Sequence, residues 1–583
     1  MKNSLECPAK AEHFEKPQKA GSSTKIERKH FVTNRSLDFL NLKELTKQIG
    51  HAPSDWPLVC TKELIDNALD ACEEAGTSPE ISVSIDDDEI TVQDNGPGIP
   101  PHVIDSVVDF DVRISSRSEV INPSRGAQGN ALKTLVAMPF VLSGHGKVII
   151  ESQGTRHEIR IQIDHIRAEP IVIHDKSESN VKDGTKFTVE WPDSASWLEN
   201  QNDQVLQNDK SDSDSASWLL EDAKSRILQI AQEYCAFNSH LSLSVRCDSK
   251  NLTIKPTNTE WKKWLPSYPS DPHWYAVADM KRIISANIRR NPDMPLRELV
   301  AEFSGLSSSA KQMRVAAVSG LLRARLSDFA TEKNELDSGK IESLLSAMKA
   351  EASPIKPVSL GVIGRDHLEA TFALSDSERE SFKYKKILGT SNGLPWIVET
   401  CFAYTPKSNM GNGRIITGIN WSPGIQNPFR QLGAVSLDTV LTEQKVDLEE
   451  PIVFFLHVVC PKISHADHGK SSVNLDDEQV DAIVNAVQSV TKIWCQQVKA
   501  EERDAQAFNR RSALFSRKTI AFSDVASEIL PGAYDHASGG GKPTVERSRR
   551  GLERVYCADD SEAGVVRDPV QMEPFSFFFH MFA

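Results

Sequence analysis

Hydrophobic and polar positions follow two different periods along the chain, and these periods predict the order of helices and strands. A 3.6-residue period predicts an amphipathic helix over 56–74, and two-residue alternation predicts strands over 81–85 and 90–92. The same two patterns return further on, as a helix after residue 129 and strands over 147–151, 158–163 and 186–191. Helices mixed with a hairpin-rich sheet favour a two-layer α/β sandwich in an α+β protein.

The second half of the chain changes character twice. Short helical patterns occur over 297–303, 309–329 and 338–349, strand patterns return after residue 393, and a long helical pattern runs over 476–511. We therefore expect five regions: a polar leader over 1–29, a first domain over 30–255, a helical domain over 256–370, an α/β domain over 371–515, and a weakly ordered tail over 516–583. The tail holds one short apolar stripe that could dock a partner.

A polar stretch interrupts the first domain. The hexapeptide DSASWL occurs at 193–198 and again at 214–219, with a polar filler between the copies. Two copies are too few for a repeat protein, which needs about three units to bury a continuous core. We expect a solvent-exposed loop; a partner-binding loop is the alternative.

Composition narrows the class of protein. The chain has 583 residues, a formal charge of −14, 39% hydrophobic and 25% charged residues, which is ordinary globular usage and excludes disordered and collagen-like chains. No apolar run approaches about 18 residues and the N-terminus lacks a signal-peptide core, so we expect no membrane association. Nine cysteines without a CxxC pair argue against a zinc site and for reduced thiols. We expect a cytoplasmic protein, associated with the nucleoid if it is bacterial.

The helix over 56–74 carries the first candidate chemistry. Glu63, Asn67 and Asp70 stand at i, i+4 and i+7, so they share one face of that helix. A solvated acidic face is the ordinary interpretation. However, asparagine is a poor helix former, and a carboxylate that activates water would stand beside an amide oxygen that can bind a hard cation such as Mg²⁺.

Three glycine-containing turns follow. Asp94-Asn-Gly-Pro-Gly98 comes directly after a predicted strand, and Asp94 can accept a hydrogen bond from an exocyclic amine, although such a turn is common in hairpins. The sequence 125–130, RGAQGN, opens a helix, where backbone N–H groups can bind phosphate. Gly184-Thr185 precedes another strand. Neither a Walker P-loop nor a dinucleotide fingerprint is present.

Together these pieces resemble the four boxes of the GHKL (Bergerat-fold) ATPases, the superfamily of gyrase, MutL, the ninety-kilodalton heat-shock chaperone and histidine kinases. The resemblance implies ATP and Mg²⁺ as cofactors, with Glu63 as general base, Asn67 as the magnesium ligand and Asp94 as the adenine reader. It places the nucleotide-binding residues at Asn67, Asp70, Asp94, Gly96, Gly98, Arg125, Gly126, Ala127, Gln128, Gly129, Asn130 and Thr185. The kinase branch is disfavoured because no phospho-acceptor histidine box is visible.

The wording ELIDNALDACEEAG, DNGPGIP and SRGAQG is most similar to the B subunit of topoisomerase VI, a type IIB topoisomerase. The likeness continues over about 30–505: LVAEF at 299–303 resembles a helix-two-turns-helix domain, and PWIVETCFAY, GINW and VVCPKI…HGKSSV resemble a transducer domain. In the lid, RGAQGNALKTL departs from an archaeal pattern nearer RGQQGIG. The family's transducer lysine would be Lys470, with Lys462 as second choice; a solvated loop lysine is the alternative.

The resemblance implies the ATPase subunit of a topoisomerase, which dimerises through its ATPase domain on binding ATP and clamps duplex DNA. The chain has seven tyrosines and no Toprim-like pattern, so cleavage is expected of a separate Toprim/winged-helix A-type subunit. Candidate DNA contacts are Lys281, Arg282, Arg289, Arg290, Arg510, Arg511, Arg517 and Lys518. The alternative is a nucleotide-gated clamp that recruits a nuclease or a recombination or defence partner without strand passage. A chaperone- or mismatch-repair-type ATPase fits the ATP boxes but not the helical region or the transducer.

Overall fold

The computed structural model describes residues 35–529 with several gaps, at 87, 108–109, 111–118, 127–130, 165, 168, 192–218, 334, 373, 408–412, 434 and 467–471. The duplicated hexapeptide and most of the tail lie outside the described residues. The chain divides into two compact units, one of residues 1–353 with 466–471 and one of residues 354–465 with 472–583. The five predicted regions stay predictions.

The first unit is built on one eight-stranded sheet. Its order is β5-β4-β3-β6-β2-β1-β7-β8, and all neighbouring pairs are antiparallel except β1 and β7. The strands are β1 (Glu80–Ile85), β2 (Glu89–Gln93), β3 (Lys147–Ser152), β4 (Thr155–Asp164), β5 (Glu169–Glu178), β6 (Thr185–Glu190), β7 (Ser242–Cys247) and β8 (Lys250–Ile254). Buried and exposed positions alternate along β1 and β2, as the two-residue period predicts.

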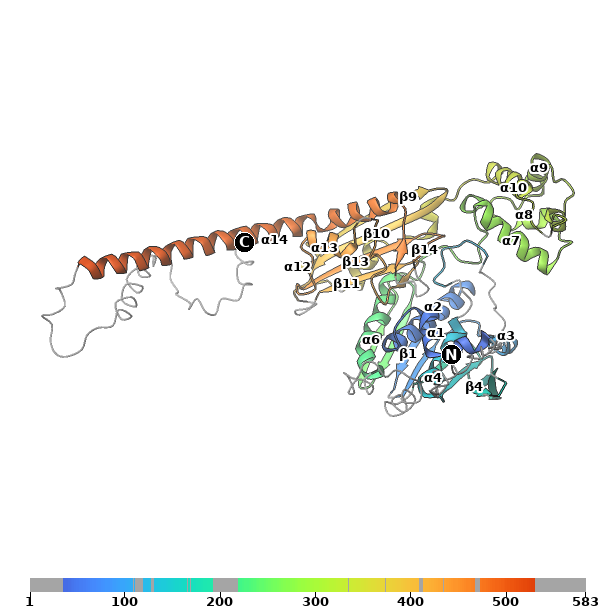
Figure 1. The fold of residues 1–583 in the computed structure, drawn as a ribbon, viewed down its shortest axis with the longest axis horizontal. Coiled ribbons are helices and arrows are strands. Elements are labelled where there is room, and N and C mark those ends of the chain that lie inside the picture. The colour runs from blue at the N-terminus through green and yellow to red at the C-terminus, as the bar shows by residue number, and fades with distance from the viewer. Residues whose placement is uncertain are drawn as a thin grey trace, which may run out of the picture. The chain divides into compact units, whose positions relative to one another are not determined.

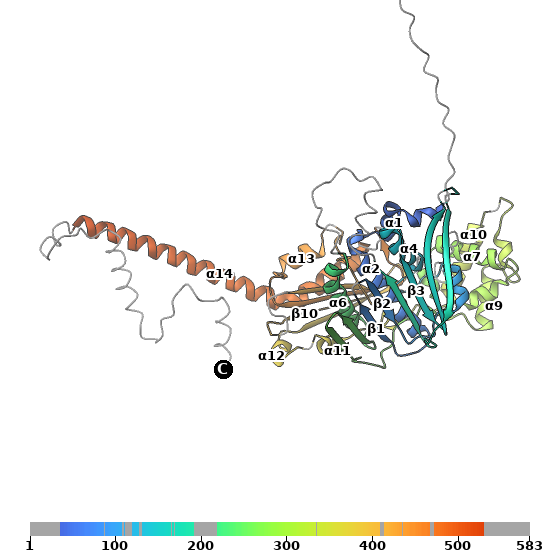
Figure 2. The same cartoon turned by 90° about the horizontal axis from the view of Figure 1, so that it is seen from below.

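Helices cover this sheet. Those before and between the strands are η1 (Arg35–Leu40), α1 (Leu42–Ile49), η2 (Pro53–Asp55), α2 (Trp56–Glu74), α3 (Pro101–Val107), α4 (Ala131–Ser143) and α6 (Leu219–Phe237). Helix α2 contacts β1 and β2, while α4 contacts β3, β4 and β6, so the two lie side by side along the sheet (Figure 2). In α2 the stripe of Leu64, Ala68 and Cys72 is buried, as the helical period predicts.

A set of short helices completes the first unit. It comprises η4 (Pro272–Trp274), α7 (Val277–Arg290), α8 (Leu296–Ala301), α9 (Ser309–Val318), η5 (Leu326–Phe329) and α10 (Ser338–Glu351). The pattern predicted over 309–329 is therefore two helical elements. Gly320 lies between these two elements and has φ +74°. Glycine adopts this left-handed conformation readily, so the chain can leave the first helix here. Helix α10 is capped at its N-terminus by Asp337, whose carboxylate accepts hydrogen bonds from the N–H groups of Gly339 and Lys340.

The second unit contains a five-stranded sheet of order β12-β11-β13-β10-β9 and one very long helix. Its elements are η6 (Pro357–Leu360), α11 (Arg365–Thr371), α12 (Asp376–Arg379), β9 (Lys383–Ser391), β10 (Leu394–Tyr404), β11 (Arg414–Ile419), β12 (Ser422–Pro423), α13 (Leu437–Glu443), β13 (Ile452–Val459), β14 (Ser464–His465), β15 (Val473–Asn474) and α14 (Asp477–Ile529). Every residue of β13 is buried, which is why its sequence is apolar throughout instead of alternating.

The first part of α14 packs on this sheet along β9 and β10 (Figure 1). Ile483, Val487 and Val490 of the helix join Phe402 and Phe454 of the strands in one buried core. The helix ends at Ile529, well beyond the predicted end at residue 511. Phe508, Leu514 and Phe515 on its later turns are exposed.

A buried carboxylate ties the segment before α11 to the second sheet. Glu399 of β10 accepts hydrogen bonds from the backbone N–H groups of Ile363 and Gly364, each at 2.9 Å, and from the Tyr384 hydroxyl at 2.5 Å. The imidazole of His457 lies 3.8 Å away. Burial favours a raised pKa for Glu399, but these donors outweigh it and hold the pKa below its usual value.

The predicted fold class is confirmed: the protein is α+β, with helices on a mixed sheet, a helical region, a second sheet and a long C-terminal helix. Among the described residues, none of the helices is both long enough and apolar enough to cross a membrane.

Glu399→Gln tests the buried carboxylate. An amide nitrogen would face donors, so we expect a loss of about 1–3 kcal/mol in the free energy of unfolding at pH 7. Because the folded pKa is depressed, the contribution of Glu399 is present above the unfolded pKa of about 4.3 and lost as pH falls below it. Urea titrations of both proteins should therefore converge at acidic pH. The exposed Glu449→Gln is the control, and an equal, pH-independent loss in both variants would contradict the assignment.

Candidate functional site

Two turns that lie about 90 residues apart in the sequence meet at the ends of β2 and β6. The backbone N–H of Asp94 donates to the carbonyl of Thr185 at 3.0 Å, and the N–H of Gly184 donates to the carbonyl of Gly96 at 2.8 Å. The Asp94 carboxylate oxygen Oδ1 accepts from the N–H groups of Gly96 at 2.8 Å and Thr185 at 3.3 Å. The structure thus brings together two of the predicted boxes, because β2 and β6 are antiparallel neighbours.

Glycine is required at two of these positions. Gly184 has φ +76°, and a Cβ built there would stand 1.9 Å from the Asp94 carbonyl oxygen. Gly98 has φ +79°, and its Cβ would stand 2.6 Å from Ser152 Oγ. Side chains at either position would force the two turns apart. Ser152 Oγ in turn donates to the Gly184 carbonyl and accepts from the N–H of Ile99, which fixes the far side of the turn.

The surroundings of the Asp94 carboxylate suit a group that accepts a hydrogen bond from a ligand. Asp94 is 8% exposed, and burial raises its pKa, while the N–H groups of Gly96 and Thr185 oppose that rise. Both backbone donors use Oδ1. Within the described part of the chain no hydrogen bond is found to Oδ2, so this oxygen can accept a proton donor from a ligand such as an exocyclic amine.

Helix α2 places the predicted catalytic and magnesium-binding residues at one stretch of its surface. Glu63 is half-buried and Asn67 is exposed, four residues further along the helix. An exposed amide oxygen one turn from a carboxylate is a donor set that fits Mg²⁺ together with an activated water. Asp70, the third residue of this face, is instead buried and bonded within the protein.

Arg125 is the partner of Asp70. Its side chain is fully buried and donates to Asp70 at 2.7 Å, to both oxygens of Glu73 at 2.7 and 2.8 Å, and to the side chain of Asn238. Lys263 also pairs with Glu73, at 2.7 Å. These cations and hydrogen bonds lower the pKa of Glu73 well below its usual value in spite of its burial, so Glu73 is ionised at neutral pH.

This cluster changes how two predicted site residues are placed. Asp70 and Arg125 contact each other and join α2 to the segment that precedes α4. Their assignment as nucleotide-contacting residues stays a prediction, and their contacts are those of groups that hold α2 in position. Sequence reasoning missed Glu73, Asn238 and Lys263, because no local motif relates residues up to about 190 positions apart.

Several predicted residues lie at the edge of the described structure or outside it. Gly126 is described, and a Cβ there would meet open space. Ala127, Gln128, Gly129 and Asn130 lie outside the described residues, as does Lys470. The second-choice lysine, Lys462, is described and is exposed.

Comparison with known proteins shows which proteins the chain is similar to. Residues 55–195, which contain α2, both turns and the segment between them, match the family model of the histidine kinase-, DNA gyrase B- and HSP90-like ATPases. The B subunit of type 2 DNA topoisomerase 6 from Sulfurisphaera tokodaii is 24% identical over 473 residues, which cover 76% of this chain and 80% of that protein. About three quarters of the chain is thus similar to topoisomerase VI B subunits, and the region of the two turns matches the GHKL ATPase family.

Other relatives carry the same name as the one from Sulfurisphaera tokodaii. The B subunit of type 2 DNA topoisomerase 6 from Metallosphaera sedula is 23% identical over 76% of this chain and 80% of that protein, and that from Archaeoglobus fulgidus is 34% identical over 27% of this chain and 28% of that protein. Among solved structures, the ATPase region of Saccharomyces cerevisiae topoisomerase II bound to ICRF-187 covers 76% of this chain and 86% of its own, at 10% identity and a TM-score of 0.35.

Gly184→Ala tests the meeting of the two turns. The substitution adds backbone strain of about 1–3 kcal/mol and drives a Cβ into the Asp94 carbonyl, so stability and adenine-nucleotide affinity should both fall. Gly76→Ala is the matched control, because Gly76 has φ +69° but nothing within 4 Å of its Cβ. Urea unfolding and fluorescent-nucleotide titration measure the two effects. If both variants behaved alike, the close approach at Gly184 would be without consequence.

Proposed function

We propose that this chain is the ATP-binding and ATP-hydrolysing B subunit of a type IIB DNA topoisomerase-like complex. The observation that carries the proposal is the junction of the Asp94 turn with Gly184-Thr185, beside a helix that presents Glu63 and Asn67. It is supported by the match of this region to an ATPase family and by the similarity of three quarters of the chain to topoisomerase 6 B subunits.

Each residue has a defined task in this proposal. Oδ2 of Asp94 accepts a hydrogen bond from the exocyclic amine of adenine, and Thr185 backs the ring. The amide oxygen of Asn67 is the ligand for Mg²⁺, which supplies charge neutralisation at the phosphates when bound. Glu63 accepts a proton from the attacking water as general base. Gly126 and residues 127–130 would contribute backbone N–H groups to the phosphates ahead of α4.

A lysine from the segment between β13 and β15 would complete the site. Lys470 is the first choice and Lys462 the second, since both belong to that segment of the sequence. A positive charge near the γ-phosphate stabilises the charge that develops during hydrolysis and loses its attraction once phosphate leaves. That difference in contacts is what a switch between two states requires.

The wider assembly follows from the same proposal. ATP would dimerise two copies through their ATPase domains around duplex DNA, and a Toprim/winged-helix A-type subunit would cleave it. A recess of about 540 Å³ on the helical region is lined by Lys281, Arg282 and Arg289. The positive charges of these side chains could bind the phosphates of DNA. Glu119 and Glu335 also line it, so the surface is mixed in sign. The alternative is a nucleotide-gated clamp that recruits a nuclease, recombination or defence partner without strand passage.

Substitutions at Glu63 and Asp94 test the nucleotide chemistry. Glu63→Gln should bind ATP and Mg²⁺ but lose hydrolysis by about 10²–10⁴-fold, because an amide cannot accept the proton of water. Asp94→Asn should instead weaken ATP binding, because its amide can place a donor against the donor of adenine. Glu74→Gln, exposed near the end of the same helix, is the control. ATP turnover and equilibrium nucleotide binding separate the two outcomes, and wild-type turnover in Glu63→Gln would refute its role.

Strand passage separates the proposal from its alternative. The chain, combined with a Toprim/winged-helix A-type subunit encoded beside it, should relax supercoiled DNA only when ATP and Mg²⁺ are present. Glu63→Gln should abolish repeated relaxation in the same assay. Cleavage without relaxation would favour the clamp that recruits a nuclease.

A further inference from the structure

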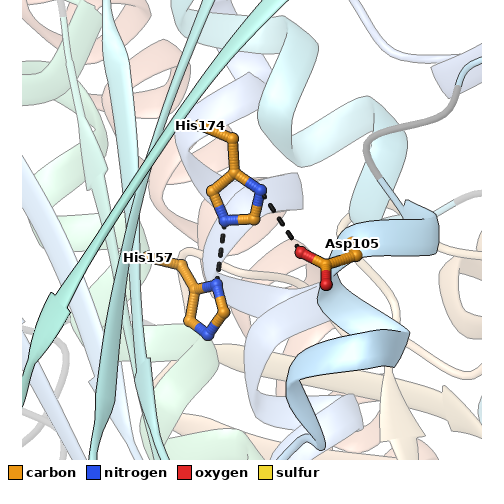
Figure 3. Close-up of side chains that lie close together, drawn as sticks. All are labelled: Asp105, His157 and His174. Atoms are coloured by element: carbon orange, nitrogen blue, oxygen red, sulfur yellow. Dashed lines mark hydrogen bonds and ion pairs between the residues drawn. The ribbon is translucent and has the colours of Figure 1, made fainter.

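Three metal-binding side chains meet at the outer hairpin of the first sheet. The Nδ1 atom of His157 on β4 lies 2.8 Å from Nε2 of His174 on β5, and Nδ1 of His174 lies 3.5 Å from Oδ1 of Asp105 on α3 (Figure 3). One ligand atom from each of the three can be chosen so that all lie within 4.8 Å of one another. None of these residues belongs to the candidate nucleotide site.

The register of the hairpin explains the meeting of the two histidines. Strands β4 and β5 are antiparallel, with Ile159 opposite His174 and His157 opposite Lys176. Positions two apart on a strand face the same side, so His157 and Ile159 share the buried side, and His174 and Lys176 face it from the edge strand. Helix α3 then supplies Asp105 to this side of the hairpin (Figure 3).

We propose that Asp105, His157 and His174 bind a zinc ion. Two imidazoles and one carboxylate are a donor set typical of zinc, with a fourth position open to water. In a tetrahedral site with Zn–N bonds of about 2.0–2.1 Å, two nitrogens stand about 3.4 Å apart. The two rings would therefore separate by about half an ångström, which the half-exposed Asp105 and the partly exposed His174 permit.

The placement of the two rings supports this assignment. The side chain of His174 is partly exposed on the edge strand β5, so an entering ion can approach the pair from solvent. His157 is fully buried, and its Nε2 has no hydrogen-bond partner in the described part of the chain. Because Nδ1 of His157 faces Nε2 of His174, these two atoms are the ones that would bind the ion.

Lys176 is the built-in competitor for the ion. Its ammonium group lies 2.6 Å from Oδ1 of Asp105, and its side chain is 45% exposed. Zinc binding would displace this ammonium from the carboxylate into solvent. Removal of the charge at residue 176 should therefore strengthen metal binding, whereas removal of a ligand should abolish it.

The consequence of binding would be a clip between α3 and the β4–β5 hairpin. Helix α3 begins three residues after Gly98, the last residue of the turn that carries Asp94. A metal at this point would hold the start of the segment that leads from that turn toward α4. No cysteine takes part, so the scarcity of paired cysteines in the sequence does not bear on this site.

Zinc titration of the full chain without nucleotide tests the proposal. Calorimetry with ZnCl₂ gives the stoichiometry, and thermal unfolding with and without zinc gives the shift in Tm. We expect His174→Ala and Asp105→Asn to bind one zinc fewer per chain than the wild type and to lose a Tm rise of a few degrees. His102→Ala removes an exposed histidine from the same helix and should retain both.

Lys176→Met supplies a gain of function that a misfolded variant cannot mimic. It should bind zinc at least tenfold more tightly than the wild type, because the competing ammonium is gone. Equal stoichiometry in the wild type, His174→Ala and Asp105→Asn would overturn the site. So would a Lys176→Met variant with unchanged affinity, since it would place the zinc away from Asp105.

Discussion

The close approach of the Asp94 turn to Gly184 is the constraint on which the candidate nucleotide site depends. A carbonyl oxygen of one turn occupies the space where any other residue at 184 would carry its Cβ. That contact aligns two backbone hydrogen bonds and uses one carboxylate oxygen of Asp94 to hold Thr185 and Gly96. The second oxygen is thereby fixed in direction before a ligand arrives, which reduces the ordering that binding must impose.

Helix α2 is held in place by buried ion pairs, whereas the two turns are held together by backbone hydrogen bonds. The fully buried Arg125 pairs with Asp70 and Glu73, and Lys263 pairs with Glu73 from a segment beyond β8. Removal of one partner from a buried ion cluster is strongly destabilising, because an unpaired charge would remain in the interior. The cluster therefore couples the helix that bears Glu63 and Asn67 to the chain segment that leads into α4.

The outer hairpin of β4 and β5 also brings titratable side chains from distant segments together, here two histidines, an aspartate and a lysine. His157, His174 and Asp105 approach one another because the register of β4 and β5 and the position of α3 bring them to the same side. The ammonium group of Lys176 forms an ion pair with the Asp105 carboxylate. His157 is fully buried while Asp105 and Lys176 are half-exposed, so a cation that replaced the Lys176 ammonium would lie between two imidazoles and a carboxylate at the edge of the sheet.

Local patterns in the sequence determined the elements and the candidate residues. Period and turn chemistry predict α2, β1 and β2, and the order of Glu63, Asn67, Asp94 and Thr185 carries the resemblance to GHKL ATPases. Interactions between distant segments were decided by the tertiary structure alone. The pairing of β2 with β6 joins Asp94 to Thr185, the burial of Asp70 depends on Arg125, and the histidine pair depends on strand register. A periodicity reports which face of an element is apolar, but partners more than a few residues apart are chosen by packing, and packing is a property of the folded chain.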